Sequence, residues 1–275
     1  MKIKNILTSL IFSFTTIAFA QVDSLCIKRT IPYRWELSVA MNSVEAQMDQ
    51  KLFDTWVYPS ANYYAYYGDK SDKSFSVSII PKYKIKDNIS VRCELGMTNI
   101  DLRSYYEGIG DTATQSQGHI GGTADIIKKD IIEQKIYRYL LGIQWQFIEK
   151  KFIGGYCGAS LNYFHYGNLY WNDYILNTTS AGRSTNYTAI TPGGYAFGTG
   201  MLVGINIYFS RQISLGGEFL YSLLYYQLGG IQNGTKEELF PTSPKQTVDW
   251  KIHNNKSEGI QFTKIMPSLN LTIRF

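Results

Sequence analysis

PSLNLTIRF, residues 267–275, ends the chain and displays the pattern that decides the fold. Leu269, Leu271, Ile273 and Phe275 are apolar, and the residues between them are polar. A period of two residues indicates a β-strand whose two faces meet different surroundings. Such a strand fits a soluble sheet with one face on a core. It also fits a membrane wall with one face in lipid and the other in a lumen.

The same alternation recurs along the whole chain. Leu141, Ile143 and Trp145, for example, are separated by Gly142 and Gln144. The odd-numbered positions are the apolar ones in every such segment. The eight segments are residues 33–41, 74–85, 89–98, 136–147, 152–163, 197–210, 213–226 and 267–275. We therefore predict eight antiparallel strands with one shared apolar face.

Short and long connections alternate between these segments. Polar turns are expected around Asp87, Lys150 and Arg211. The long connections cover residues 42–73, 99–135, 164–196 and 227–261. A compact soluble domain rarely carries four loops of this length, whereas outer-membrane barrels combine long external loops with short periplasmic turns. The pattern therefore favours a membrane barrel with four external loops and three periplasmic turns.

The short turns must keep the apolar residues on one face of the sheet. Because odd-numbered residues are apolar on both sides of each turn, each turn must contain an odd number of residues. We therefore expect turns of three or five residues. Ile85 should then lie opposite Ile89, and Phe209 opposite Ile213.

The N-terminal residues predict export. Lys2 and Lys4 precede an apolar run over residues 6–19, which ends in an Ala18-Phe19-Ala20 cleavage pattern. These features are typical of a secretory signal peptide, and the run is short for a membrane anchor, which is the alternative. We expect a signal peptide over residues 1–20, a periplasmic leader over 21–32 and a barrel over 33–275.

The composition excludes several classes of protein. Charged residues make up 18% of the chain and aromatic residues 15%, and this charged fraction is low for a soluble domain. No segment after the N-terminal run is long and apolar enough for a membrane helix. The net charge is +5 without a dense basic cluster, so we expect no nucleic-acid partner. Of Cys26, Cys93 and Cys157, at least one should stay free because their number is odd.

Aromatic residues on the apolar face should gather at two levels of the barrel. Those expected near the short turns are Tyr33, Trp35, Tyr83, Trp145, Phe147, Phe209 and Phe275. Those expected near the long loops are Phe75, Tyr137, Tyr139, Tyr163, Phe197, Tyr221 and Tyr225. Amphipathic rings favour the two interfaces of a bilayer, although Tyr and Phe favour strands in general.

With this pattern, the chain resembles the small eight-stranded outer-membrane β-barrels of Gram-negative bacteria, of the OmpA and OmpX kind. In particular it resembles the outer membrane protein beta-barrel domain proteins of Bacteroidetes. The resemblance rests on the export signal, the eight alternating segments and the terminal Phe275. It implies an all-β, antiparallel, up-and-down transmembrane barrel in the cell outer membrane, surrounded by outer-membrane lipid and lipopolysaccharide. It also implies that the barrel-assembly machinery reads Phe275 as its signal.

The polar, even-numbered face would line the lumen of this barrel. Its charged residues are Arg34, Glu36, Lys82, Lys84, Arg92, Glu94, Arg138, Glu218, Lys264 and Arg274. The interior of an eight-stranded barrel is just wide enough for its own side chains. We therefore expect these charges to pair with one another and plug the lumen, because buried charges need partners. A narrow, anion-preferring pore is the alternative.

Two of the long loops are rich in aromatic residues, namely Trp56, Tyr58, Tyr63, Tyr64, Tyr66 and Tyr67 in the first and Tyr170, Trp171 and Tyr174 in the third. Exposed aromatic loops on a rigid scaffold suit the binding of an extracellular glycan or protein. The alternative is that the strands project beyond the membrane and that these rings only pack on one another.

The sequence offers little that predicts catalysis. His165 has no serine two residues away, and His119 and His253 lack the spacing of metal ligands. We therefore predict no catalytic residue, no metal and no cofactor. The expected role is a monomeric barrel with a structural or surface-binding function, and the rival is a lipid-modifying enzyme of the same fold.

Overall fold

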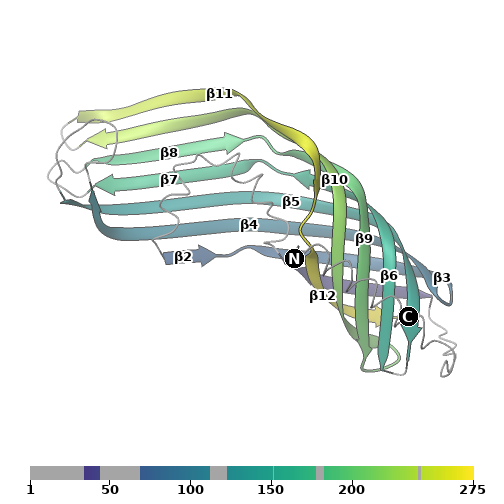
Figure 1. Ribbon diagram of the computed structural model, residues 1–275. Helices are drawn as coiled ribbons and strands as arrows, with labels where there is room; N and C mark the ends of the chain where they lie inside the picture. The colour runs from purple at the N-terminus through teal and green to yellow at the C-terminus, as the bar shows by residue number, and fades with distance from the viewer. Residues whose placement is uncertain (1–33, 44–68, 112–122, 151, 178–182, 241–242) are drawn as a thin grey trace, which may run out of the picture.

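The computed structural model describes residues 34–43, 69–111, 123–150, 152–177, 183–240 and 243–275. The predicted signal peptide and leader, together with Tyr33 and Cys26, lie outside these residues. The described part is all-β and forms one antiparallel sheet of twelve strands (Figure 1). The strands are β1 (Trp35–Asn42), β2 (Asp69–Asp72), β3 (Phe75–Lys86), β4 (Ile89–Asp111), β5 (Thr123–Glu149), β6 (Ile153–Tyr166), β7 (Leu169–Asn177), β8 (Ser184–Thr191), β9 (Gly194–Tyr208), β10 (Ile213–Phe240), β11 (Ser243–Phe262) and β12 (Met266–Arg274).

Eight of these strands close into a ring. Its order is β1, β3, β4, β5, β6, β9, β10 and β12, and β12 then pairs with β1. Leu271, in the C-terminal strand, lies opposite Val39 of β1 and opposite Leu215 of β10. The final strand therefore joins the N-terminal strand to the rest of the ring, and each of the eight predicted segments contributes one strand to it.

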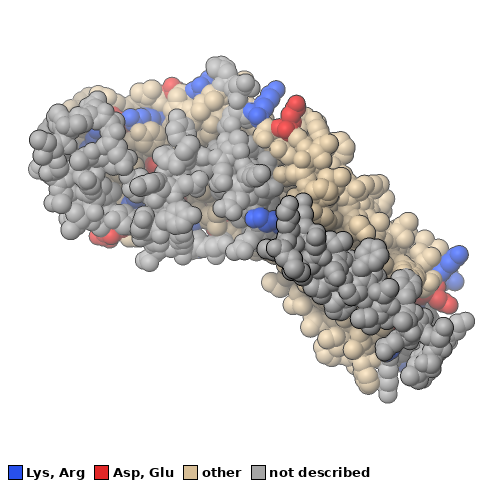
Figure 2. Space-filling view, in the orientation of Figure 1, with Lys and Arg blue, Asp and Glu red and all other residues tan. Residues whose placement is uncertain are grey.

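The two faces of the ring differ as the alternation predicts. Odd-numbered residues point outward and even-numbered residues point inward, because successive side chains of a strand lie on opposite faces. In β9, for example, Met201 is 74% exposed and Leu202 is 3% exposed. On the face shown in Figure 2, the described surface of the ring between its two ends is almost entirely uncharged.

The prediction that four long, irregular loops follow the ring strands is wrong in the described residues. β4 extends to Asp111, β5 starts at Thr123, and β10 extends to Phe240. β2, β7, β8 and β11 lie within segments that were expected to be loops. These segments escaped detection because polar residues occur on both of their faces and interrupt the alternation, whereas the backbone pairing that makes them strands is independent of side-chain polarity.

We call the sheet made by these longer segments the extension. Its strands pair in the order β2, β4, β5, β7, β8, β10 and β11. Figure 1 shows it as a curved sheet that continues from one end of the ring at an angle. Register is continuous between the two parts, since Ile153 pairs with Ile207 in the ring and Leu169 pairs with Thr191 in the extension.

The inward-facing parity changes between β6 and β7 and between β8 and β9, whereas β4, β5 and β10 keep even-numbered residues inward in the extension. Tyr166 in β6 and Ala196 in β9 are buried at even positions, whereas Trp171 in β7 and Ala189 in β8 are buried at odd positions. The breaks between these strands fall at residues 167–168 and 192–193. The chains approach closely there, since a Cβ on Gly193 would collide with the carbonyl oxygen atoms of Tyr166 and Gly167.

The short turns keep the apolar residues on one face of the sheet in two ways. Phe209 N donates to Ile213 O at 3.1 Å, so this turn has three residues and places Phe209 opposite Ile213 as predicted. In the first turn Ile89 pairs with Lys86, so the turn has two residues, and the predictions of an odd turn length and of Ile89 facing Ile85 are both wrong there. A register shift between Lys84 and Lys86 supplies the extra residue, and a bulge of this kind restores parity beside a two-residue turn.

The apolar core lies inside the molecule, nearer to the extension than the charged residues of the ring. Its members include Leu140, Phe164, Leu224, Leu228 and Met266, all of them at even positions and buried. The even face is therefore polar in one part of the ring and apolar near the extension. No helix of the described residues is long and apolar enough to cross a membrane.

Candidate functional site

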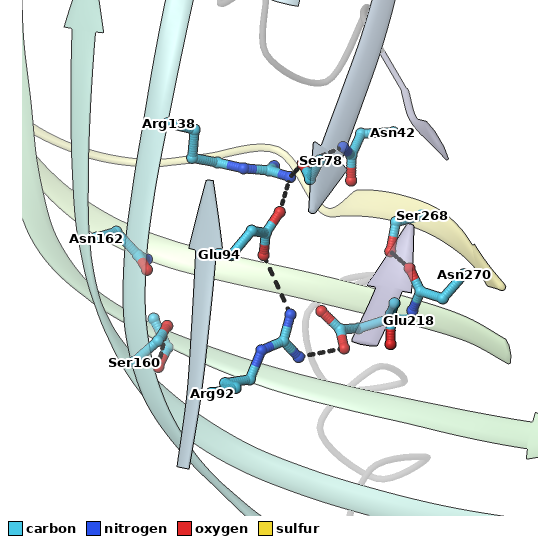
Figure 3. A network of polar contacts seen from close by, with 12 residues as sticks. Asn42, Ser78, Arg92, Glu94, Arg138, Ser160, Asn162, Glu218, Ser268 and Asn270 are labelled. Carbon is cyan, nitrogen blue, oxygen red and sulfur yellow. Dashed lines mark hydrogen bonds and ion pairs between the residues drawn. The ribbon is translucent and has the colours of Figure 1, made fainter. Parts of the chain in front are cut away.

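A buried ion-pair network crosses the interior of the ring (Figure 3). Arg92 on β4 lies between two carboxylates, with Nη1 2.5 Å from Glu218 Oε2 and Nη2 3.1 Å from Glu94 Oε2. Arg138 on β5 donates from Nη2 to the other oxygen of Glu94. The alternating pattern directs these even-numbered side chains inward, and ring closure brings β10 across from β4. We call this group, with Lys82, the lumen network.

Neutral side chains complete the lumen network. Tyr156 Oη donates to Glu218 Oε2 at 2.8 Å, and Lys82 Nζ lies 5.3 Å from the centre of the Tyr156 ring. Ser78 Oγ accepts from Arg138 Nη2 at 2.9 Å. Sequence reasoning missed Tyr156 because its neighbours Gly154, Gly155 and Cys157 obscure the alternation of that segment.

A second pair lies near the short-turn end of the ring. Arg274 Nε is 3.0 Å from Glu36 Oε1, and the Arg274 guanidinium lies 4.2 Å from the centre of the Tyr208 ring. Tyr208 Oη accepts from Gln146 Nε2 at 2.9 Å. Paired charged groups therefore occupy the interior of the ring at two levels, namely the lumen network and the Arg274–Glu36 pair near the short turns.

Two residues of the predicted lumen set lie elsewhere, and a third is partly exposed. Arg34 and Lys264 are exposed, and Lys84 is partly exposed. Arg34 precedes β1, and Lys264 lies between β11 and β12, so the strand alternation does not control the direction of either side chain. Lys84 lies beside the bulge that leads into the first turn.

The extension contains a buried charged group of its own. Lys128 Nζ lies 3.5 Å from Asp130 Oδ2 and 3.6 Å from Asp173 Oδ1, and all three side chains are buried. Burial raises the pKa of Asp173 to about 7, and the neighbouring Asp130 adds to this rise, whereas Lys128 opposes it. Sequence reasoning missed the group because Asp173 has odd parity in a segment that was expected to be a loop.

The aromatic binding candidates separate into two sets. Trp56, Tyr58, Tyr63, Tyr64, Tyr66 and Tyr67 lie outside the described residues. Tyr170, Trp171 and Tyr174 belong to strand β7 and not to a loop. Trp171 is 5% exposed and packs in the core, so it is not available on the surface. Tyr170 and Tyr174 are partly exposed, because they lie on the opposite face of β7.

Tyr174 lines a hollow of about 510 Å³ near the end of the extension that lies away from the ring. Other residues of the lining include Lys129 on β5, Asn172 on β7, Asn186 on β8, Glu237 on β10 and Lys245 on β11. The hollow therefore spans five strands. Its volume lies in the range of ligand pockets, which is roughly 300–1,000 Å³.

The remaining candidates form no metal-ligand cluster among the described residues. His165 points outward and stacks on Tyr137, with ring centres 6.2 Å apart. His119 lies outside the described residues, as does the side chain of His253. Cys93 and Cys157 are free and partly exposed. No group of three or more His, Cys, Asp or Glu side chains that could hold a metal ion occurs in the described part.

Phe275 lies on the outer face at the short-turn end of the ring. Its side chain is exposed, and its backbone N donates to Trp35 O at 3.0 Å. Trp35 in turn packs against Tyr83, with ring centres 4.8 Å apart. At the other end of the ring, Phe197 and Tyr225 pack at 5.4 Å. Aromatic pairs therefore occur at both predicted levels.

Comparison with solved structures found outer-membrane proteins of several kinds. A major outer membrane protein from Thermus thermophilus is 10% identical with a TM-score of 0.31, and the match covers 89% of this chain and 100% of that chain. The outer membrane protease OmpT from Escherichia coli is 9% identical with a TM-score of 0.35, covering 88% and 94%. Neisserial surface protein A is 12% identical with a TM-score of 0.30, covering 88% and 96%.

A similarity at this level says nothing about what the chain binds or catalyses. A scan against protein-family models and a search of curated proteins found no match.

Proposed function

We propose that the chain is an outer-membrane, up-and-down β-barrel of eight strands that carries a recognition surface on its extension. One observation carries the proposal, namely the continuous band of exposed apolar side chains around a closed ring. Its members include Ile79, Leu95, Leu141, Leu161, Ile205, Phe219 and Leu269, from seven of the eight ring strands. An exposed apolar surface of this extent would be unstable in water, and lipid is the solvent that it suits.

The arrangement of connections supports one orientation of this barrel. Short turns lie at one end of the ring, and the extension rises from the other end. Outer-membrane barrels keep short turns in the periplasm and long segments outside, so the extension would project from the cell. Export by the signal peptide, insertion by the barrel-assembly machinery and contact with lipopolysaccharide belong to the same proposal.

The lumen network argues for a plugged barrel over a pore. Arg92, Glu94, Arg138 and Glu218 are at most 3% exposed and hold one another across the interior. An ion that passed would have to separate these pairs, and breaking a buried pair by removing one partner costs about 3–5 kcal/mol. We therefore propose a structural role for the ring and assign recognition to the extension.

The enzyme alternative finds less support. His165 stacks on Tyr137 and points outward, and among the described residues no carboxylate or serine hydrogen bonds to it. A general base for nucleophilic catalysis needs hydrogen-bond contact with both the nucleophile and an orienting group. We propose that His165 belongs to the outer interface of the barrel.

Two cysteine variants of the full chain, expressed in a Gram-negative host, test location and orientation together. A membrane-impermeant maleimide should label Asn233→Cys on intact cells, because Asn233 is exposed on the extension. It should label Asp87→Cys in the first turn only after the outer membrane is opened. The unmodified chain provides the background, to which Cys26 of the expected leader contributes after the membrane is opened, together with Cys93 and Cys157 on the lipid-facing side. Equal labelling of both variants on intact cells would overturn the orientation.

The plugged lumen needs a separate measurement. The purified protein in a planar lipid bilayer should give no reproducible conductance steps. Regular steps from the unmodified protein would favour the pore and would leave the barrel itself intact.

A further inference from the structure

The hollow around Tyr174 contains a row of hydrogen-bonding side chains on neighbouring strands. Asn172 Nδ2 on β7 donates to Asn186 Oδ1 on β8 at 3.1 Å. Asn186 lies directly opposite Glu237 of β10 in the sheet register, and Lys245 Nζ on β11 lies 2.7 Å from Glu237 Oε1. Each member orients the next, so the row presents planar amide and carboxylate groups in fixed positions.

The charges that line the hollow cancel. Lys129 and Lys245 carry two positive charges, and Glu237 and Glu238 carry two negative charges. A hydrogen bond from Lys245 lowers the pKa of Glu237, and one from Lys236 lowers that of Glu238, so both carboxylates stay ionised at neutral pH. Because these carboxylates already have cationic partners, a metal ion meets no uncompensated negative charge here. Lys129 is exposed to solvent, with its Nζ 5.6 Å from the centre of the Tyr105 ring, so it adds little to the binding of an organic anion.

An uncharged ligand with many hydroxyl groups fits these properties. The floor of the hollow is paired β-sheet, so its backbone groups are already used. The side chains still have capacity, since the Asn172 carbonyl oxygen has no partner among the described residues. Hydroxyl groups both donate and accept, and the adjacent Tyr174 ring offers an apolar surface for the C–H face of a sugar.

We propose that this hollow binds an uncharged carbohydrate. The inference deepens the proposed function, because it names the ligand class of the recognition surface and rests on the extension lying outside the cell. Two sources share this chemistry, namely the cell's own surface polysaccharide and polysaccharides from its surroundings.

The test uses the full-length protein in nanodiscs of synthetic phosphatidylcholine, which contain no glycolipid. The probes are maltotriose, chitotriose and xylotriose, with sialyllactose and trigalacturonate as charged probes of similar size. Saturation-transfer NMR should detect at least one neutral probe and should show at least tenfold weaker binding of both charged probes. An oligosaccharide released from the producing cell's lipopolysaccharide forms a further arm, and preferential binding of an uncharged form supports the proposal with a resident ligand.

Two site variants and one control complete the design. Asn172→Leu removes the open end of the row, and Tyr174→Ala removes the ring, so each should weaken binding at least tenfold. Asn233→Leu is the matched control, because Asn233 is exposed on β10 outside the hollow, and it should bind like the unmodified protein. The heat-dependent gel shift of barrels reports whether each variant is folded.

Two results would overturn the proposal, namely no binding of any neutral probe, or neutral binding that both site variants keep. If surface labelling of Asn233→Cys succeeds and glycan binding fails, only this inference falls. If the labelling itself fails, the proposed function falls first.

Discussion

Arg92 and Glu218 face each other across the interior of the ring, with Arg92 Nη1 2.5 Å from Glu218 Oε2, although 126 positions separate them in the sequence. The contact exists because β4 and β10 lie on different sides of a closed ring, each with its even-numbered side chains inward. Glu94 contacts the same guanidinium, so Arg92 has two anionic partners. The pair therefore links ring closure to the filling of the interior.

Glu218→Ala should destabilise the ring strongly. The change removes one partner of Arg92 and the acceptor of the Tyr156 hydroxyl. Breaking a buried pair in this way costs about 3–5 kcal/mol. Urea unfolding of the protein in lipid vesicles measures the loss. Glu237→Ala breaks a surface pair with Lys245 and serves as the control, with an expected loss of about 0–1 kcal/mol. Similar losses in the two variants would contradict a structural lumen network.

Ile205→Arg should be far more costly than Val248→Arg. The two side chains are 58% and 59% exposed, so exposure alone does not distinguish them. Ile205 lies in the exposed apolar band of β9, between Val203 and Ile207, and Arg near the bilayer midplane costs roughly 2–4 kcal/mol. Val248 lies on β11 of the extension, where we expect water and a change within about 0.5 kcal/mol. Unfolding in vesicles compares them, and equal costs would argue against a membrane around the ring.

Asp173→Asn should change how the stability of the extension depends on pH. The pKa of Asp173 is raised to about 7, chiefly by burial, so the folded state holds a proton that the unfolded state releases above about pH 4. Stability should therefore fall as pH rises from about 4 to 7 and stay level above that. The variant should lose this fall and gain stability at pH 8 of a few kcal/mol at most, since one pKa unit corresponds to about 1.4 kcal/mol.

Hydrogen exchange of β7 amides at pH 5 and pH 8 measures this effect. Asp101→Asn is the control with the opposite sign, because a hydrogen bond from Arg103 lowers the pKa of that carboxyl. Its stabilising effect should be present at neutral pH and be lost as pH falls toward the lowered value. If the protection of the β7 amides increased between pH 4 and pH 7, this would contradict the raised pKa of Asp173.

Gly204→Ala should destabilise the ring, whereas Gly217→Ala should not. A Cβ on Gly204 would collide with the Tyr156 ring, which is held by Glu218. Overpacking of this kind costs about 1–3 kcal/mol. A Cβ on Gly217 meets nothing within 4 Å, and a residue with less backbone freedom than Gly stabilises a strand by about 0.5–1 kcal/mol. Unfolding midpoints in urea should move in opposite directions, and a loss at both positions would place the cause outside the Tyr156 contact.

Part of the site could be predicted from the sequence, and part could not. Even parity identified Lys82, Arg92, Glu94, Arg138 and Glu218 as residues of one face, because the alternation of a strand depends only on local geometry. Their partners were not predictable, since pairing across the interior depends on which strands close the ring.

The extension shows the limit of the same reasoning. Its strands have polar residues on both faces, so they lack the alternation that marks a half-buried strand. The sequence therefore leaves two interpretations of the segment around Trp171, an exposed binding loop and projecting strands whose rings pack, and the structure places Trp171 in a strand and in the core. The irregularities at residues 167–168 and 192–193 reverse the inward parity, and only the paired backbone reveals that change.

By itself, the sequence determined the alternating segments and their shared apolar face, because one side-chain direction per residue is a local property of an extended chain. It therefore also determined that PSLNLTIRF is a strand with Leu269, Leu271 and Ile273 on the outer face. The tertiary structure alone decided that this strand pairs with both β1 and β10, that the ring closes around the lumen network, and that the long connections continue as a sheet. These features depend on contacts between residues far apart in the chain, which no local pattern records.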